Sequence, residues 1–579
     1  MNGKRLKEWI WVILLLAGIF SQASAQQMKI SAGRMHSVGI CLNDNGKVIS
    51  WGGNDQGQLG DCTFVDRSSP GNSSLLSGAR VISAGRAHTC IIKQDSTVWC
   101  WGMNDDGQLG IGNNTDRPYP VQVPGINNAI DIVAGRYFTG CLRADSTIWT
   151  WGDNSLGQLG DSSFTNRNSP VRVRTTRKFI KIGGTYNHLL AILPNDSVMA
   201  WGWNSVYQLG DGTTTNRYAP VTVQGIDSVI MVTGGKEFSI LLRRNGTVYT
   251  WGESSDGRLG LNCLSTGADR VFPLLVPGIN QITKVVCGEY HCYALAQDGS
   301  LYGWGDNGNR AVGNNSSSDQ LCPEQLMGAQ GPGSYLEDIV DVAAGFYHGL
   351  AINAAGTFFA WGKNSEGNCG QGFFGADIPY ARIIGAMCNG APMPVEYSWI
   401  NARVKEDGRV NLDWASNSEM NLSHYRAEKS IDGIHFQSFA KVNRQNVNLN
   451  AATYSSDDLS PGKGHVYYRV TGVDFNGSEH CSEIKALFID ENTQSGGLRA
   501  SVWPNPTNEI LHLSFGTESK SQVKVALLNQ MGQILKTQEI FPEDATQTEF
   551  NIKGLAPGFY FLQISQGGSS VIERVMVTR

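Results

Sequence analysis

The amino-acid sequence predicts an all-β protein, with a seven-bladed β-propeller followed by two small β-sandwich domains. The first observation is a phrase, WGDNSLGQLGD at residues 151–161, that occurs in seven exact or weaker copies. The second is glycine: 69 of 579 residues, with only 19 prolines, which indicates many tight turns between short strands. The third is the spacing, because a period of about 50 residues is typical of a propeller. The copies begin at Trp51, Trp101, Trp151, Trp201, Trp251, Trp304 and Trp361.

Residues 1–25 are expected to be a signal peptide, so that the mature protein begins at Gln26. Lys4, Arg5 and Lys7 form a basic start, an apolar run follows, and the last three residues are small, as at a cleavage site. The apolar run is shorter than the roughly 20 residues that a membrane-spanning helix needs. We therefore expect export.

Residues 26–390 are expected to form the propeller, with four strands in each repeat. Three short strands are predicted within residues 81–101, and a fourth follows a long loop at Pro120. If the first strand after the signal peptide and the last strand, from Pro379, share one blade, their pairing closes the ring. Closure leaves no sheet edge open to aggregation.

Two motifs carry a family resemblance. The sequence A-G-x-x-H occurs at residues 32–36, 84–88 and 344–348, and the phrase W-G-x-N-x-x-G-Q-L-G follows it. Over about residues 27–388 they resemble the repeat of the regulator of chromosome condensation family, whose members form seven-bladed propellers. The founding members act as nucleotide exchange factors for a small nuclear GTPase and bind chromatin. That role is not expected here, because a fold alone does not imply an activity and this chain has a signal peptide.

The recurring tryptophans and histidines are expected to be structural. A tryptophan at the end of a strand in every blade can pack between neighbouring sheets. The plant ultraviolet-receptor branch of the family uses a tryptophan cluster as its chromophore, but Trp99, Trp149 and Trp203 are too few and scattered for that. The histidine slot also holds Phe138 and Phe238, which cannot bind a metal, so packing or capping is favoured over a metal ring. These histidines are His88, His188, His291 and His348.

An arginine that recurs in successive repeats is expected to hold the long loop of each blade. Asp66, Asp116 and Asp269 stand next to three of these arginines, so clamps to a neighbouring carbonyl or acid are favoured over an anion-binding ring. The aspartates after the phrase QLG are expected to cap turns rather than to bind calcium. The arginines are Arg67, Arg117, Arg167, Arg217 and Arg270, and the aspartates are Asp61, Asp161 and Asp211.

No enzymatic function is expected. The sequence has no G-x-S-x-G, no H-E-x-x-H and no phosphate-binding loop, so no catalytic residue, cofactor or metal is predicted. A net charge of −5 disfavours nucleic acid as a partner. Export permits disulfides among the twelve cysteines, but the sequence does not reveal their pairing. Cys41 and Cys141 share a slot with Ile91 and are expected to fill core positions.

Residues 391–495 are expected to form a β-sandwich. Strand patterns alternate along them, and Trp414, Tyr467 and Tyr468 would fill a core between two sheets. The piece LDWASNSEMNLSHYRAEKSIDG resembles a fibronectin type III-like module that precedes the C-terminus of many secreted Bacteroidota proteins. We expect this module to be a spacer.

Residues 496–579 resemble the C-terminal sorting domain of the type IX secretion system. Three motifs carry the resemblance in order: VWPNPTNEILHLSF, VALLNQMGQIL and LAPGFYFLQIS, with G-F-Y expected just before the penultimate strand. The resemblance implies export through the periplasm and across the outer membrane by the type IX machinery of a Gram-negative bacterium of that phylum. It also implies removal of the sorting domain, with the cargo released or joined to surface lipopolysaccharide. The motif residues are Pro504, Asn505, Pro506, Gly532, Gly558 and Tyr560.

The leading hypothesis is a non-catalytic binding protein, secreted or at the cell surface, whose propeller loops recognise a protein or a glycan. Function should lie where the repeats differ, since variable loops on one face of a propeller form a rigid platform. Two alternatives stay open: a secreted inhibitor of an enzyme, known from a bacterial branch of this fold, and a hydrolytic enzyme. Exposed aromatic side chains serve protein and sugar recognition alike. The candidate contacts are Phe64, Phe164, Trp203, Tyr207, Tyr218, Phe373 and Phe374.

Overall fold

The computed structural model of the chain is almost entirely β. Across the residues that it describes, helical geometry is confined to the short 3-10 turn η1 (Ser255–Gly257) and to Cys263, and no helix is long and apolar enough to cross a membrane. The predicted signal peptide, residues 1–25, lies outside the described residues. The described residues are 28–73, 76–184, 186–261, 263, 267–328, 331, 333–384, 396–405, 407–418, 422–433, 435–444, 452–474, 479–482, 484–489, 499–503, 510–516, 522–528, 534–540, 547–553, 555, 558–566 and 569–577.

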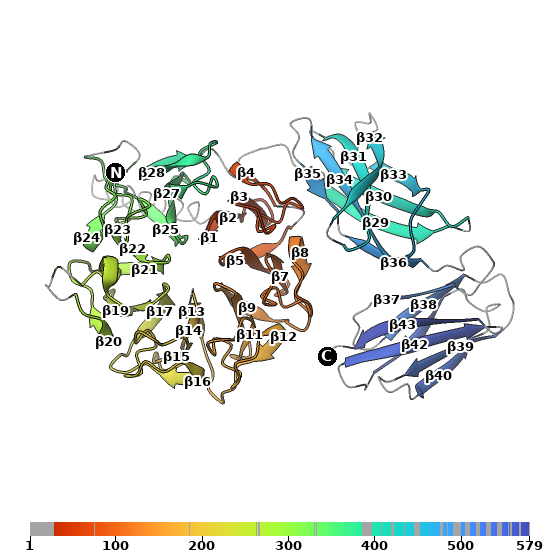
Figure 1. The fold of residues 1–579 in the computed structure, drawn as a ribbon, viewed down its shortest axis with the longest axis horizontal. Coiled ribbons are helices and arrows are strands. Elements are labelled where there is room, and N and C mark those ends of the chain that lie inside the picture. The colour runs from red at the N-terminus through yellow and green to blue at the C-terminus, as the bar shows by residue number, and fades with distance from the viewer. Residues whose placement is uncertain are drawn as a thin grey trace, which may run out of the picture. The chain divides into compact units, whose positions relative to one another are not determined.

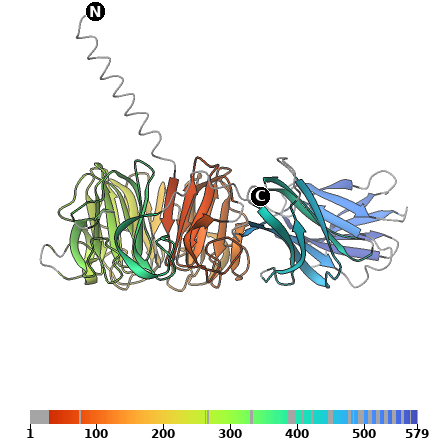
Figure 2. The same cartoon turned by 90° about the horizontal axis from the view of Figure 1, so that it is seen from above.

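Residues 28–384 form seven four-stranded antiparallel sheets around a central axis (Figure 1), which confirms the predicted propeller. In each blade the strands follow chain order, with the first strand nearest the axis, and they run between the two faces of the disc (Figure 2). The first four blades are β1 (Met28–Ala32), β2 (His36–Cys41), β3 (Lys47–Gly52) and β4 (Arg67–Asn72); β5 (Ala79–Ala84), β6 (His88–Lys93), β7 (Val98–Gly102) and β8 (Arg117–Gln122); β9 (Ala129–Ala134), β10 (Phe138–Arg143), β11 (Ile148–Gly152) and β12 (Arg167–Arg172); β13 (Lys181–Gly184), β14 (His188–Ile192), β15 (Val198–Gly202) and β16 (Arg217–Thr222). The last three are β17 (Val229–Gly234), β18 (Phe238–Arg243), β19 (Val248–Gly252) and β20 (Arg270–Leu275); β21 (Ile282–Cys287), β22 (His291–Ala296), β23 (Leu301–Gly305) and β24 (Gln320–Gln325); β25 (Ile339–Ala344), β26 (His348–Asn353), β27 (Phe358–Asn364) and β28 (Gly375–Ile384).

The core lies between neighbouring blades. The second and third strands of each blade are almost fully buried, as in β6 and β7, because a neighbouring sheet covers each of their faces. They read as continuous apolar runs for the same reason. Each repeated tryptophan is fully buried, and its indole N–H donates to a backbone carbonyl of the preceding blade. Examples are Trp101 to Gln58 O at 2.9 Å, Trp151 to Gln108 O at 2.8 Å and Trp201 to Gln158 O at 3.0 Å.

The histidines also join neighbouring blades. His88 Nε2 lies 3.0 Å from Thr139 Oγ1, and His188 Nε2 lies 2.8 Å from Ser239 Oγ. Burial lowers the pKa of His88 to about 3 and that of His188 to about 4, so both rings are neutral. His348 bonds to Ser37 in the same way, so three of the four predicted histidines have the capping role. His291 has the packing role instead: its Nε2 has no hydrogen-bond partner among the described residues, and its ring packs edge-on against Tyr293 at 5.0 Å.

The ring does not close through a shared blade, and that expectation was wrong. β1 pairs within the first blade and β28 within the last, because the repeats begin with a first strand and end with a fourth. Closure comes instead from contacts between the two blades. Phe346 N donates to Gly33 O at 3.0 Å, and Trp51 Nε1 donates to Asn368 O at 2.8 Å.

The arginine clamps exist, and Arg117 donates to the neighbouring carbonyl of Asp116 at 3.1 Å, but the acids that pair with the arginines are not the adjacent ones. Arg67 pairs with Asp61 at 2.6 Å, and Arg167 and Arg217 pair with Asp161 and Asp211 in the same way at 2.9 and 2.7 Å. Neighbouring side chains on an extended backbone point to opposite sides, so an acid next to the arginine cannot face it. The adjacent aspartates accept backbone N–H bonds instead: Asp66 from Asn54, Asp116 from Asn104 and Asp269 from Ser254.

Three cysteine pairs are bonded within the described part of the propeller: Cys90–Cys100, Cys263–Cys322 and Cys287–Cys292. Cys41 and Cys141 are both buried, as their slot predicts. Cys141 is a free thiol, whereas Cys41 is disulfide-bonded.

The strands after the propeller form two sandwiches, which are described separately. In the first, Trp414 packs edge-on against Tyr425 from the facing sheet at 5.5 Å, and Tyr468 is buried as predicted, whereas Tyr467 is only partly buried. Its likeness to fibronectin type III modules stays a prediction. One sheet holds β29 (Glu396–Val404), β30 (Val410–Ser418) and β33 (Ala452–Asp458), and the other β31 (Leu422–Ser430), β32 (Gln437–Asn443), β34 (Gly464–Asp474), β35 (Glu479–Cys481) and β36 (Lys485–Ile489).

The second sandwich buries Leu513, Val525 and Leu562 between its two sheets. Gly558 and Tyr560 lie inside the penultimate strand rather than before it, which corrects the expectation. Pro504, Asn505, Pro506 and Gly532 lie outside the described residues. The sheets are β37 (Arg499–Trp503), β38 (Ile510–Gly516) and β41 (Gln547–Asn551), and β39 (Val523–Leu528), β40 (Ile534–Ile540), β42 (Gly558–Gln566) and β43 (Ser569–Val577).

Candidate functional site

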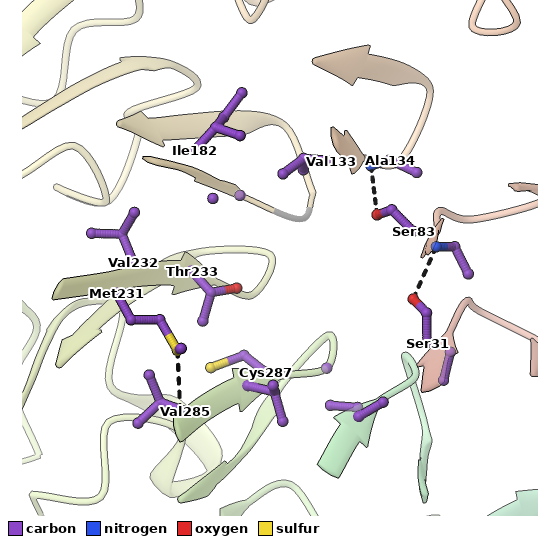
Figure 3. Close-up of a pocket in the computed structure, with 18 of the residues that line it drawn as sticks. Ser31, Ser83, Val133, Ala134, Ile182, Met231, Val232, Thr233, Val285 and Cys287 are labelled. Carbon is purple, nitrogen blue, oxygen red and sulfur yellow. Dashed lines mark hydrogen bonds between the residues drawn. The ribbon is translucent and has the colours of Figure 1, made fainter. Parts of the chain in front are cut away.

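A cavity of about 310 Å³ runs along the axis of the propeller, lined by the first strand of every blade (Figure 3). Most of its wall is apolar. Its polar groups bond from blade to blade: Ser31 Oγ accepts from Ala84 N at 3.0 Å and Ser83 Oγ from Ala134 N at 2.9 Å. These bonds in the middle of the channel hold neighbouring blades together. The charged and aromatic side chains that could bind a ligand lie at its mouth.

Two sets of variable loops leave the propeller on the same side. In the first blade His36 pairs with Gly52, and Gly52 pairs in turn with Arg67. The short loop between the first and second strands and the long loop between the third and fourth strands therefore leave the blade at the same end of its strands. The register recurs in the other blades. We call this side the loop face.

A belt of backbone hydrogen bonds fixes the short loops around the mouth. Gly85 is needed in this belt, because a Cβ there would lie 2.4 Å from Gly135 O. The loops therefore set one side chain per blade around the axis, and we call these seven residues the mouth ring: Arg34, Arg86, Arg136, Tyr186, Lys236, Glu289 and Phe346. The belt includes Arg34 N to Gly85 O, Arg86 N to Gly135 O, Arg136 N to Tyr186 O, Lys236 N to Glu289 O, Glu289 N to Phe346 O and Phe346 N to Gly33 O, at 2.9–3.3 Å.

Two aromatic rings meet at the mouth. Tyr186 and Phe346 come from the fourth and seventh blades, and their centroids are 5.8 Å apart. Both are buried and both line the axial cavity. They form an apolar floor that the charged members of the mouth ring surround.

One side of the mouth is cationic. The guanidinium groups of Arg86 and Arg136 lie 4.9 and 4.8 Å from the centroid of the Tyr137 ring, and Arg136 also lies 4.7 Å from Tyr186. Among the described residues, neither these two arginines nor Arg34 forms an ion pair, and the Nε of Arg136 is buried without a hydrogen-bond partner. Three adjacent blades therefore each carry at the mouth an arginine that forms no ion pair with a described residue.

The opposite side is acidic and phenolic. Burial, together with the Glu289 carboxylate, raises the pKa of Tyr186, Tyr290 and Tyr347, so all three hydroxyls stay protonated. Lys236 Nζ donates to the Tyr290 hydroxyl at 2.6 Å. These phenols are hydrogen-bonding groups rather than bases at neutral pH.

Arg258 compensates some of the acids on this side. It replaces the glutamine of the phrase QLG, is buried, and pairs with Glu237 at 3.0 Å, with Asp256 at 2.7 Å and with Glu253. Burial and the neighbouring Glu253 raise the pKa of Glu237. In the fifth and sixth blades the carboxylates Glu237, Glu253, Asp256 and Glu289 stand beside the cations Lys236 and Arg258. The first-to-second-strand loops of the first three blades carry Arg34, Arg86 and Arg136 and no acid, although Asp106 and Asp153 follow in the long loops of the second and third blades.

The predicted aromatic contacts lie on the loop face, but mostly further from the axis. Only one pair is brought together, Phe164 with Tyr218, at 5.2 Å between ring centroids. Trp203 and Tyr207 are partly buried, and Tyr207 has a φ of 67°, in a slot that is glycine in most copies. Their role as ligand contacts stays a prediction. The exposed members of the set are Phe64, Phe164, Tyr218, Phe373 and Phe374.

Sequence reasoning missed the mouth ring. Its signal was visible in the motif A-G-x-x-H: the two variable positions hold Arg-Met in the first blade, Arg-Tyr in the third and Phe-Tyr in the seventh. These two positions vary from blade to blade although their neighbours are constant, and function was expected where the repeats differ. The sequence alone does not reveal the hydrogen bonds between the short loops, so it does not show that these positions come together around one channel mouth.

Three family models match the chain. The RCC1-like domain matches residues 15–332, the regulator of chromosome condensation (RCC1) repeat matches residues 339–371, and the secretion system C-terminal sorting domain matches residues 501–578. The last match confirms the predicted sorting domain and supports secretion or display at the outer-membrane surface.

Curated relatives match short stretches. The human "Probable E3 ubiquitin-protein ligase HERC3" is 35% identical over 111 residues, which are 18% of this chain and 10% of that protein. The "Ultraviolet-B receptor UVR8" of Arabidopsis thaliana is 34% identical over 106 residues, 18% of this chain and 23% of that receptor. The chain thus spans less than a quarter of the length of either relative.

Solved structures share the fold. Yeast RCC1 (Prp20) bound to Kap60 is 19% identical, covers 64% of this chain and 87% of that one, and has a TM-score of 0.53. A second structure, Prp20p from Saccharomyces cerevisiae, is 20% identical, covers 64% and 90%, and has a TM-score of 0.52. At this identity the likeness shows a shared propeller fold.

Proposed function

The chain belongs to the RCC1-like domain family, and on that premise we propose that its propeller is a non-catalytic binding module whose loop face recognises a protein or a glycan. The observation that carries the proposal is the mouth ring, where seven blades present seven side chains of mixed charge on a rigid floor. The C-terminal sorting domain directs the protein to the outside of the cell, so its ligand would be met there.

The chemistry of the mouth supports binding. Guanidinium groups, protonated phenols and aromatic faces are the side chains that dominate recognition sites. The raised pKa values of Tyr186, Tyr290 and Tyr347 keep these groups as hydrogen-bond donors at neutral pH. The backbone belt holds them in place before a ligand arrives, which lowers the entropic cost of binding.

Export and attachment complete the proposal. The type IX machinery is the partner that the sorting domain implies, and the motif residues in the last 80 or so residues would be read by it. We further propose that this domain is removed on export and that the propeller is released or joined to lipopolysaccharide. Inhibition of a foreign enzyme would be one form of protein recognition by the same face.

The test is a binding screen of the purified full chain against glycans, polysaccharides and surface or secreted proteins. A loop-face variant, Tyr137→Ala with Tyr290→Ala, is compared with a matched control, Trp149→Ala with Tyr249→Ala. The control pair is also partly buried and packs against cations, but near Arg143 and Arg243 at the other ends of the blades. A saturable ligand that the loop-face variant alone loses supports the proposal. A ligand lost only by the control variant contradicts it.

A parallel variant tests the outer aromatic contacts. Phe164→Ala with Tyr218→Ala removes the one predicted pair that is in contact. Weakened binding in this variant would extend the recognition surface from the mouth to the rim, whereas unchanged binding would confine it to the mouth.

A further inference from the structure

We propose that Arg34, Arg86 and Arg136 form a carboxylate-binding site at the channel mouth, and that the ligand is a protein segment with acidic side chains. The inference rests on the proposed function of the loop face and deepens it by naming the chemistry of the ligand. Its evidence is that these three arginines form no ion pair among the described residues, in contrast to Arg67, Arg167, Arg217 and Arg258.

Elsewhere in the described propeller, three arginines of the recurring slot, Arg67, Arg167 and Arg217, have acids beside them, whereas Arg117 donates to a backbone carbonyl. Arg67 has Asp61, and Arg167 has Asp161, within 2.9 Å. Arg258, which is nearly fully buried, is surrounded by three carboxylates. In the part of the chain that the structure describes, the three mouth arginines have no such partner, and one buried nitrogen of Arg136 lacks any hydrogen bond. Burying a donor without an acceptor is unfavourable, so an anion from outside would relieve that cost.

The guanidinium groups of Arg86 and Arg136 are already positioned for one ligand, and the backbone of Arg34 is bonded to the loop that carries Arg86. Arg86 and Arg136 lie against the same ring, Tyr137, at 4.9 and 4.8 Å. The backbone N–H of Arg34 donates to the loop of the second blade, and that of Arg86 to the loop of the third. Stacked, fork-shaped guanidinium groups bind carboxylates through paired hydrogen bonds, and a fixed geometry makes this binding specific.

The charge pattern favours a protein over a uniform polyanion. On the far side of the same mouth stand Glu237, Glu253 and Glu289, in the fifth and sixth blades. A polyuronate or another evenly charged polymer that reached the arginines would also be pressed against these carboxylates. A protein segment can place its acids at the arginines and neutral or basic residues at Glu289, which matches the divided mouth.

The experiment selects ligands without assuming a sequence. A displayed library of random twelve-residue peptides is panned against the immobilised full chain, and against the variant Arg86→Gln with Arg136→Gln. A control, Arg174→Gln with Arg177→Gln, loses the same charge from exposed arginines in the loop between β12 and β13, at the other end of the blades. A further variant, Arg86→Lys with Arg136→Lys, keeps the positive charge but loses the paired N–H donors of the guanidinium group. Thermal midpoints of all variants verify folding.

The proposal predicts that the unmodified chain and the control enrich peptides in Asp and Glu, and that the glutamine variant does not. The best acidic peptide should bind the glutamine variant about tenfold to a hundredfold more weakly, and the lysine variant at an intermediate level. Changing that peptide's Asp and Glu to Asn and Gln should cause a similar loss.

Two results would overturn the inference. One is enrichment that shows no acidic bias, with peptides that are nevertheless lost in Tyr137→Ala with Tyr290→Ala; the loop face would then bind proteins by other chemistry, and the proposed function would stand. The other is arginine-dependent binding of oligogalacturonate that is tighter than binding of any selected peptide, which would assign the site to a polysaccharide. If neither peptide nor glycan depended on the loop face, both proposals would fail together.

Discussion

Replacing His88 by phenylalanine should make the propeller less sensitive to acid. The Thr139 hydroxyl donates to Gln108 O at 2.8 Å, so it accepts from His88 Nε2, 3.0 Å away. His88 Nδ1 is then the bare nitrogen, and it is buried without a partner. Protonating it would place a buried charge beside no acceptor, which is why burial lowers the pKa of His88 to about 3.

The sign of the effect follows from linkage. The unfolded chain, with a histidine pKa of about 6.5, binds a proton below pH 6.5, and the folded chain does not until about pH 3. The stability due to neutral His88 is fully present above pH 6.5 and is lost as the pH falls. Between pH 7.5 and pH 5 the loss is about 1.5 pH units at 1.36 kcal/mol each, or about 2 kcal/mol.

The assay is urea unfolding of the full chain at both pH values. At pH 7.5 His88→Phe should cost only about 1 kcal/mol, because Thr139 keeps its bond to Gln108 and phenylalanine fills the same slot in the third and fifth blades, at Phe138 and Phe238. From pH 7.5 to pH 5 the variant should lose about 2 kcal/mol less than the unmodified chain. An equal loss in both proteins would refute the neutral inter-blade histidine.

Three further predictions follow from the packing, each measured by urea unfolding at pH 7.5. Trp151→Phe should cost about 2–4 kcal/mol of stability, because it removes the hydrogen bond to Gln108 O and leaves a cavity. Trp149 in the same blade is only partly buried, so Trp149→Phe should cost less than about 1 kcal/mol. Equal costs would contradict the role of the Trp151 indole in joining blades. Asp161→Asn should cost about 1–2 kcal/mol by breaking the pair with Arg167, and no change would show that the clamp is not stabilising. Tyr207→Gly should stabilise the fold by up to about 1 kcal/mol, because it relieves a φ of 67°; destabilisation would show that contacts of the Tyr207 ring outweigh the strain.

The fold was predictable because its information is periodic. The constant spacing of the tryptophans and the turn after each strand can be read directly from the sequence. The tryptophans are buried between the blades, as the period predicts. The fourth strands begin at the recurring arginines, such as Arg117 in β8. Local patterns of this kind need no knowledge of distant contacts.

Apart from the start of the strand at Gly558, the errors concern contacts that local sequence patterns do not reveal. Asp61 lies six residues from Arg67, and only the path of the long loop brings the two side chains together. Closure of the ring depends on Gly33 and Phe346, which lie at opposite ends of the propeller sequence. The mouth ring was missed for the same reason: its residues are about 50 positions apart, and they converge only when all seven blades are assembled.

The claim that the loop face is the recognition surface is tested most directly by hydroxyl-radical footprinting of the full chain, with and without the first ligand from the screen. Oxidation is read by mass spectrometry at Tyr137, Tyr290 and Tyr347, with Trp99 and Trp149 in the third strands as internal references. Our account predicts that the ligand reduces oxidation of the three tyrosines and leaves both tryptophans unchanged. Protection of the tryptophans, with the tyrosines as reactive as before, would contradict it.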